Sequence, residues 1–435
     1  MTRYPRTLVA LLTACSALAV PRAGAQKVSS TEQAIAAAVD THNADALALL
    51  KQIVNTNSGT MNFAGVRQVA DALRPQLDAL GFTTHWVDGS SFNRAGHLVA
   101  EHAGPGPKLL LIGHLDTVFP VGSKFQQWTQ LDDSTATGPG IIDMKGGDVM
   151  IIYALRALKD AGQLDRMNVT IVYDGDEENA GAPLSAARRT LIDAAAGAKV
   201  AIGFEDGAGD PATAVVSRRG AGSWTLTTTG NAGHSSQIFR SDIGAGAVFE
   251  ASRILTAFYT QLRGEQYLTF NPGLALGGTT VAPDSNAAAG RAAGEHNVVA
   301  EHMVVEGDIR TLSPAQLATT KQTMRGIVSR HLPQTNATIV FDDGYPPMAP
   351  TAGNRKLLAV YDQASRDLGF GAVKAVDPSR AGAADVAFIA DRVPMIIDGV
   401  GLSGHDDHSE KETAYLNWLP RLTKRAAITL YRLSQ

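Results

Sequence analysis

The sequence has few of the features that would mark a small secreted scaffold or a nucleic-acid-binding protein. Its single cysteine, Cys15, cannot form a disulfide bond within the chain, so the fold does not depend on disulfides. The formal net charge of −4 provides no broad basic surface, and we expect no nucleic acid partner. Aromatic residues make up only 6%, but 44% of the 435 residues are hydrophobic, enough for a large core and more than one domain.

Long apolar runs are also missing, except at the start of the chain. An apolar stretch, Leu8–Val20, follows two arginines and precedes the small residues Ala23 and Ala25. This pattern predicts an export signal over residues 1–25 and a periplasmic or secreted protein. Loss of its three arginines changes the formal charge from −4 to about −7. No later segment is long and apolar enough to span a membrane.

Two alternatives for this segment remain. The tetrapeptide "LTAC" ending at Cys15 resembles a lipoprotein cleavage box, although the apolar stretch continues beyond the cysteine. A short buried helix is the other alternative, and the flanking residues fit export better.

Alternating helix and strand patterns over residues 26–213 and 347–435 predict an α/β domain with a mostly parallel sheet. The expected helices include 31–55 and 65–82, and the expected buried strands are 108–115, 167–176, 199–207 and 393–401.

Residues 214–346 have a different pattern, in which half-buried strands alternate with amphipathic helices. The pattern predicts a small antiparallel sheet with two helices on one face, inserted into the first domain as a lid or dimerisation domain. The alanine- and glycine-rich segment 285–297 is expected to be a flexible loop. The expected strands are 222–230, 268–278, 297–312 and 337–344, and the expected helices are 245–262 and 314–332.

The segment "LLLIGHLDTV", residues 109–118, places a histidine and an aspartate at the end of a buried strand. Side chains two positions apart in a strand point to the same face, so Asp116 can contact the ring of His114. Carboxylates orient metal-binding histidines in this way. A histidine–aspartate pair at a solvated strand end is the simpler alternative.

Other candidate strands of the first domain are also followed by histidines or carboxylates. Because the carboxyl ends of parallel strands form the ligand crevice, we expect these groups to meet. Histidine nitrogen and carboxylate oxygen without thiolate suit zinc, with cobalt or manganese possible. The residues are Asp176, Glu177, Glu178, Glu205, Asp206, His405 and His408.

A glycine-rich turn, "GPGIIDMKGG", leads to Asp143 before another expected helix, where an ordinary N-cap is the simpler interpretation. With "HLD", "DGDEEN", "FED" and "HSEKE", this turn forms an ordered series over the chain. The series resembles the zinc exopeptidases of peptidase family M20, which include bacterial glutamate carboxypeptidase, aminoacylase and succinyl-diaminopimelate desuccinylase. The resemblance covers essentially all of the chain after the signal, including the insert.

The resemblance implies two zinc ions per chain. It matches His114 to a ligand of one zinc, Asp143 to the carboxylate bridging both, Glu178 to a second ligand of one site, and Glu205 and His408 to the other site's remaining ligands. Asp206 is an alternative to Glu205. His405 competes with His408, but only His408 stands in a His-x-x-x-Glu arrangement, completed by Glu412.

The resemblance also implies the chemistry. Two metal ions activate a bridging water and polarise the scissile carbonyl. Glu177 matches the general base, and Asp116 the residue that holds His114. A cis peptide bond is implied between Asp143 and Met144.

Two segments of the insert match further elements of the family. "GNAGHSS" resembles a loop that offers a histidine, here His234, to the carbonyl oxygen, and Asn297 and Arg310 match residues that grip a substrate carboxylate. A turn histidine and an arginine paired with Asp308 are the simpler alternatives. In dimeric members the inserted domains pair and the histidine reaches the partner's site, which implies a homodimer. A monomer whose hinge brings His234 to its own metals is the alternative.

Two departures limit the substrate prediction. "AGAAD", residues 381–385, lacks the hydroxyl common in the family beside the aspartate, and Tyr345 or a neighbour replaces an arginine of the glutamate carboxypeptidase branch. Arg380 could supply a compensating charge. The expected activity is a carboxypeptidase acting on a small peptide, with an N-acyl amino acid deacylase and a catalytically silent binding protein as alternatives. A serine hydrolase would need a Gly-x-Ser-x-Gly elbow, which is missing.

Overall fold

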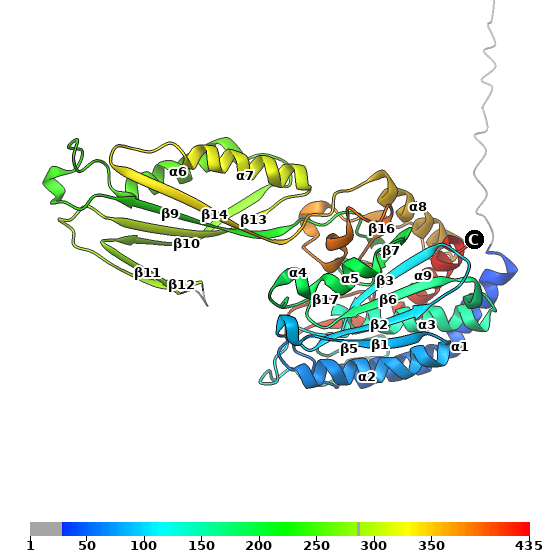
Figure 1. Ribbon diagram of the computed structural model, residues 1–435. Coiled ribbons are helices and arrows are strands. Elements are labelled where there is room, and N and C mark those ends of the chain that lie inside the picture. Colours follow the sequence, from blue (N-terminus) through cyan, green and yellow to red (C-terminus); the bar gives the residue numbers. More distant parts are fainter. Residues whose placement is uncertain (1–27, 285–287) are drawn as a thin grey trace, which may run out of the picture.

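The structure, a computed structural model, describes residues 28–284 and 288–435. The predicted export signal, residues 1–25, lies outside the described residues. Two lobes follow one another along the long axis of the molecule (Figure 1). Each lobe is built on its own sheet, and we call them the parallel lobe and the antiparallel lobe. Within residues 28–284 and 288–435, no helix has the length and apolar character needed to cross a bilayer.

The parallel lobe contains a six-stranded sheet in the order β1-β2-β6-β3-β7-β16. Strands β6, β3, β7 and β16 run parallel to one another, whereas β1 and β2 are antiparallel to their neighbours. The sheet is therefore mixed and mostly parallel, which confirms the predicted fold class; β1 and β2 were not predicted. The strands are β1 (Thr83–Asp88), β2 (Gly96–His102), β3 (Lys108–His114), β6 (Asn168–Asp174), β7 (Val200–Gly203) and β16 (Ile396–Ile397).

Apolar residues bury both faces of this sheet. In β3, Leu109 and Leu111 belong to one core cluster, whereas Leu110 and Ile112 belong to the other. A strand buried on both faces carries an unbroken apolar run, and it can expose polar groups only at its ends. The carboxyl end of β3 is where His114 stands.

Helices pack around the sheet, and α1, α3 and α9 pack against one another (Figure 1). Helix α1 begins with a capping box between Ser29 and Glu32, and α2 ends at the left-handed Gly81. The longer helices of this lobe are α1 (Ser30–Val54), α2 (Phe63–Leu80), α3 (Gly146–Asp160), α8 (Ala352–Asp367) and α9 (Leu419–Leu433), with short helices α4 (Leu184–Ala187) and α5 (Arg189–Ala194).

The antiparallel lobe contains a four-stranded sheet in the order β10-β13-β9-β14. Helices α6 (Ala247–Leu262) and α7 (Pro314–Val328) cover one face, and Phe258 and Met324 pack there with Trp224 and Leu226. All four strands lie within residues 214–346, the range expected for the insert. They are β9 (Ala221–Gly230), β10 (Thr269–Gly278), β13 (His302–Arg310) and β14 (Thr335–Tyr345).

The segment 285–297 is not wholly a loop, so that expectation is wrong in part. Strand β12 (Ala289–Ala293) pairs with β11 (Thr280–Asp284) in a two-stranded ribbon beside β10. Main-chain hydrogen bonds hold such a pair, and alanine and glycine leave the approach of a second backbone open. Residues 285–287 lie outside the described ranges.

A small sheet in the order β17-β18-β5-β4 joins distant parts of the parallel lobe. Through the pairing of β18 with β5, the segment containing His408 and Glu412 lies beside the glycine-rich turn before α3. Its strands are β4 (Thr129–Gln130), β5 (Thr135–Thr137), β17 (Gly404–His405) and β18 (Thr413–Tyr415); β8 (Thr213–Ala214) and β15 (Lys374–Ala375) form a further parallel pair.

Candidate metal centre

His114 is the last residue of β3, and its ring is buried. Its Nε2 lies 3.1 Å from Oδ1 of Asp143 and 3.5 Å from Oε1 of Glu205. Glu205 follows β7, which pairs with β3, so the two strands deliver their terminal side chains to one point. These three residues form a group whose ligand atoms could hold one metal ion.

His408 approaches the same aspartate from the other side. Its Nε2 lies 2.9 Å from Oδ2 of Asp143 and 3.2 Å from Oε2 of Glu178. The two oxygens of Asp143 therefore face two separate histidine groups. This corrects the expected grouping, in which Glu205 and His408 shared a site: Glu205 lies with His114 because β7 neighbours β3, and Glu178 follows β6 on the other side.

The alternatives for two ligands differ in their surroundings. The His405 ring is about half exposed and lies 2.9 Å from Asp406, outside both groups. Asp206 lines the adjoining cavity, also outside both groups. Asp407, which the sequence analysis missed, lies with Asp143 and His408, close enough to share a metal ion. Its position directly before His408 was the available signal.

Glu412 holds the turn that presents Asp143. Its carboxylate accepts hydrogen bonds from the main-chain N–H groups of Gly140, Ile142 and Asp143, at 2.9, 2.9 and 3.1 Å. The cis peptide bond implied between Asp143 and Met144 is present. Asp143 is not the N-cap of α3, which begins three residues later at Gly146.

Asp116 is fully buried and supports the site in two ways. Nδ1 of His114 lies 3.1 Å from the main-chain carbonyl of Asp116 and 3.5 Å from its carboxylate, so the carbonyl is the nearer partner. The carboxylate itself accepts hydrogen bonds from the main-chain N–H groups of Glu177 and Glu178, at 3.1 and 3.2 Å, and from the Thr60 hydroxyl. Asp116 thus connects His114 to the loop after β6.

Glu177 lines a cavity of about 460 Å³ with Asp143, Glu205 and His408. Burial, together with the neighbouring Glu205, raises the pKa of Glu177 well above its usual range. Two arginines also line this cavity: Arg218, whose Nε lies 2.6 Å from Asp398, and the exposed Arg380. The cavity therefore combines the ligand groups, a glutamate and positive charge.

A second cavity, of about 440 Å³, adjoins the site on the side of Glu178. Met61, Val118 and Val121 contribute apolar surface to it, and the Met61 and Val121 side chains are 62% and 67% exposed. Consecutive residues, Glu177 and Glu178, line the two cavities, so the loop after β6 borders both.

The three predicted residues of the antiparallel lobe do not line either cavity. His234 is exposed and lies beside Asn297, whose carbonyl accepts a hydrogen bond from the N–H of Ser235. Arg310 ends β13 at the opposite end of the sheet, ~30 Å away for a nine-residue strand. Its Nε lies 3.3 Å from Asp308, the partner expected in the simpler interpretation.

The donor set fits two divalent metal ions. The ligands are nitrogen and oxygen without sulfur, as zinc accepts, and Oε1 of Glu178 is buried without a hydrogen-bond partner among the described residues. Burial and the nearby Asp143 raise the pKa of Glu178 to about 7 and that of Glu412 to about 8. The buried carboxylates of Glu178, Glu412 and Asp143 therefore lie close together without enough positive charge nearby, and bound cations would supply that charge.

Two histidine–carboxylate groups sharing one aspartate define the site of a dinuclear metal-dependent hydrolase. The sequence model of peptidase family M20/M25/M40 matches residues 110–432, and the chain belongs to this family. This confirms the resemblance noted in the sequence. Carboxypeptidase G2 of Pseudomonas sp. (strain RS-16) is 26% identical over 386 residues, which cover 87% of this chain and 86% of that relative.

Solved structures share the fold. The aminopeptidase PepT from Bacillus cereus superposes with a TM-score of 0.70 at 16% identity, covering 90% of this chain and 99% of that one. The YXEP protein of Bacillus subtilis, described as a dinuclear metal-binding peptidase of family M20, gives a TM-score of 0.60 at 14% identity, covering 91% and 99%.

Proposed function

We propose that this protein is a di-zinc carboxypeptidase that hydrolyses the amide bond next to an amino acid with a free carboxylate. The observation that carries the proposal is the placement of Asp143 between His114 and His408, at 3.1 and 2.9 Å, with Glu177 in the same cavity. The similarity to carboxypeptidase G2 supports this activity.

Each residue has a distinct role in this proposal. His114, Asp143 and Glu205 would hold one ion, and His408, Asp143 and Glu178 the other. The bound ions would lower the pKa of water and polarise the scissile carbonyl, and cobalt or manganese could replace zinc. Glu177, which neither group requires, takes a proton from the attacking water and returns it to the leaving nitrogen.

Arg380 is the proposed partner of the substrate carboxylate within one chain. It lines the cavity of the ligand groups, is exposed there, and forms no salt bridge with a carboxylate of residues 28–284 or 288–435. A guanidinium binds a carboxylate through two parallel hydrogen bonds. Arg310, at the near end of the antiparallel lobe, remains the alternative, and the two arginines can be compared directly.

The second cavity would take the part of the substrate on the other side of the scissile bond. Its wall at Met61, Val118 and Val121 favours an apolar peptide side chain or acyl group there. A substrate that reaches from this wall to Arg380 has its amide bond beside Glu177 and Glu178.

We also propose an exported homodimer in which a second copy completes the site. His234 and Asn297 lie together at the far end of the antiparallel lobe, away from the cavities of their own chain. Phe239 and Phe249 in the same lobe are 69% and 52% exposed, and their ring centroids lie 5.8 Å apart. This surface can therefore bury apolar area against a second copy of the chain. His234 of that copy would donate a hydrogen bond to the carbonyl oxygen during attack.

The proposal is tested with purified protein and elemental analysis. We expect about two transition-metal ions per chain, loss of hydrolysis after dialysis against a chelator, and recovery with zinc or cobalt. Dipeptides, folyl-type glutamates and N-acyl amino acids are then incubated with the protein, and products are identified by mass spectrometry. Active protein without stoichiometric metal would overturn the proposal, and cleavage of N-acyl amino acids alone would reassign the protein as a deacylase.

A further inference from the structure

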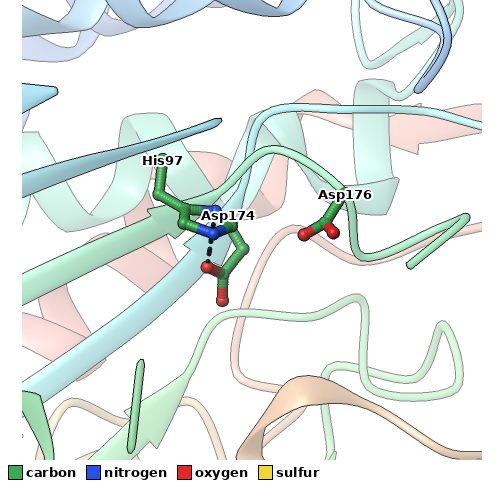
Figure 2. Close-up of side chains that lie close together, drawn as sticks. All are labelled: His97, Asp174 and Asp176. Carbon is green, nitrogen blue, oxygen red and sulfur yellow. Dashed lines mark ion pairs between the residues drawn. The ribbon is translucent and has the colours of Figure 1, made fainter. Parts of the chain in front are cut away.

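A buried charged cluster lies directly behind the loop of Glu177. Figure 2 shows its first three members, His97, Asp174 and Asp176, all fully buried. Nδ1 of His97 lies 2.9 Å from Oδ1 of Asp174. By atom type these residues form a third group in the described ranges that could hold a metal ion.

The cluster contains its own cation, so we assign no metal to it. The buried Arg188 donates from Nη1 to Oδ1 of Asp176 at 2.6 Å, and its Nε lies 2.7 Å from Asp385. The second oxygen of Asp176 accepts the N–H of Gly181. Burial opposes the charged form of His97, but the carboxylates of Asp174 and Asp176 together raise the pKa of His97. Arg188 therefore supplies positive charge among the buried carboxylates.

Arg188 also contacts the main chain of the loop after β6, which contains Glu177. Its Nη2 donates to the carbonyl of Asp176 at 3.0 Å and to the hydroxyl of Tyr345. The Tyr345 hydroxyl in turn donates to the carbonyl of Glu177 at 2.8 Å. Because Asp116 accepts the N–H of Glu177, both main-chain polar groups of Glu177 are held by hydrogen bonds.

Tyr345 belongs to the connection between the lobes. It is the last residue of β14 and pairs with Ala221, the first residue of β9. Just beyond it, the main chains of Arg218 and Met348 exchange two hydrogen bonds of 2.9 Å. The Tyr345 ring packs edge-on against Phe388, with centroids 4.8 Å apart. A rotation of the antiparallel lobe about this connection would therefore move the hydroxyl that holds Glu177.

We propose that Tyr345 and Arg188 are positioning residues that fix Glu177 and couple its position to the connection between the lobes. The inference rests on the proposed role of Glu177 as general base. The tyrosine hydroxyl bridges the buried Arg188 to the main chain of the loop after β6. A misplacement of ~1 Å at a reacting group can cost ~10²-fold in rate.

The test is Tyr345→Phe, which removes the hydroxyl and keeps the ring against Phe388. The matched control is Tyr361→Phe: Tyr361 is buried in α8 against Arg425 and makes no contact with Glu177. We expect Tyr345→Phe to lower kcat by ~10-fold or more with KM changed less than ~2-fold. Metal content and melting temperature should match those of the control. An unchanged kcat, or an equal fall in the control, would overturn the inference.

A double variant tests whether the two residues act through one contact. If Arg188→Lys and Tyr345→Phe both release the Glu177 carbonyl, the double variant should be no more than ~2-fold slower than the slower single variant. Independent, multiplicative losses would contradict the shared contact. If Arg188→Lys does not fold, the kcat of Tyr345→Phe alone decides. If Glu177→Gln is active, Glu177 is not the general base and the proposed function fails at that point. If Glu177→Gln is inactive but Tyr345→Phe has normal turnover, only the present inference is refuted.

Discussion

Glu412 accepts a hydrogen bond of 3.1 Å from the main-chain N–H of Asp143, across 269 positions of sequence. Glu412 therefore holds the main chain of Asp143, whose carboxylate both histidine groups share. Carboxylates behind metal ligands fix the geometry of those ligands, and their loss commonly reduces metal affinity.

Glu412→Gln should weaken metal binding by ~10- to 100-fold. The amide keeps one acceptor oxygen but turns an N–H₂ group towards one of the main-chain N–H groups of the Asp143 turn. Competition with a chromophoric chelator measures the affinity. The control is Glu410→Gln, an exposed glutamate two positions earlier, which should bind metal as the parent does. Equal affinities for the two variants would contradict this role.

Glu177→Gln should retain its metal and lose turnover by at least ~10²-fold, because the proton acceptor is removed while the proposed ligands stay. Elemental analysis and steady-state kinetics on the same preparation separate the two effects. Near-normal turnover would exclude Glu177 as the base.

Arg380→Ala should reduce kcat/KM for substrates with a free carboxyl end by ~10- to 100-fold, since a charged hydrogen-bonding partner is lost. Amidated analogues should be poor substrates of the parent and little affected by the change. Arg310→Ala, measured beside it, should keep the preference for free ends. The reverse pattern would assign the carboxylate contact to Arg310.

Val121→Asp should lower kcat/KM by ~10-fold or more for substrates with an apolar acyl group, because a charge replaces apolar surface in the second cavity. Val340→Asp is the control, since Val340 is also 67% exposed but lies on β14 in the antiparallel lobe. If both variants keep the parent's preference for apolar groups, the substrate does not use this cavity.

His234 should act on the active site of a partner chain. Glu177→Ala and His234→Ala proteins, each nearly inactive alone, are dissociated and reassociated together. The mixed dimer has one site with an intact base and an intact histidine, so part of the activity should return; loss of one such donor costs ~10²- to 10³-fold. With chain exchange verified, no recovery would favour a monomer that closes on itself.

The sequence predicted the central strands and their terminal residues because a strand buried on both faces reads as an apolar run that ends abruptly. His114 and Glu205 followed from that pattern and from the family resemblance. Strands β1 and β2 were missed: β1 alternates exposed and half-buried residues, and β2 begins at Gly96 with few strong strand formers. Their places depend on pairing with β6, which local sequence does not encode.

The contacts around the site were harder to predict because several depend on the main chain. The i to i+2 rule correctly placed Asp116 beside His114, but the nearer acceptor is its carbonyl, and its carboxylate serves Glu177 and Glu178 instead. The contact of Arg188 with Tyr345 joins residues from two lobes, and no spacing rule relates them. Which proposed ligands lie together, Glu205 with His114 and Glu178 with His408, depends on the order of the strands in the sheet, and the sequence alone does not give that order.

In the proposed site, the small sheet that brings β18 to β5 makes the last part of the chain a condition for binding the second ion. All six strands of the parallel sheet are complete by Ile397, but His408 and Glu412 come later. When all strands of the parallel sheet have been synthesised, His408 and the residue that supports Asp143, Glu412, have therefore not yet been synthesised. We therefore expect a chain truncated after residue 401 to bind at most the proposed ion at His114.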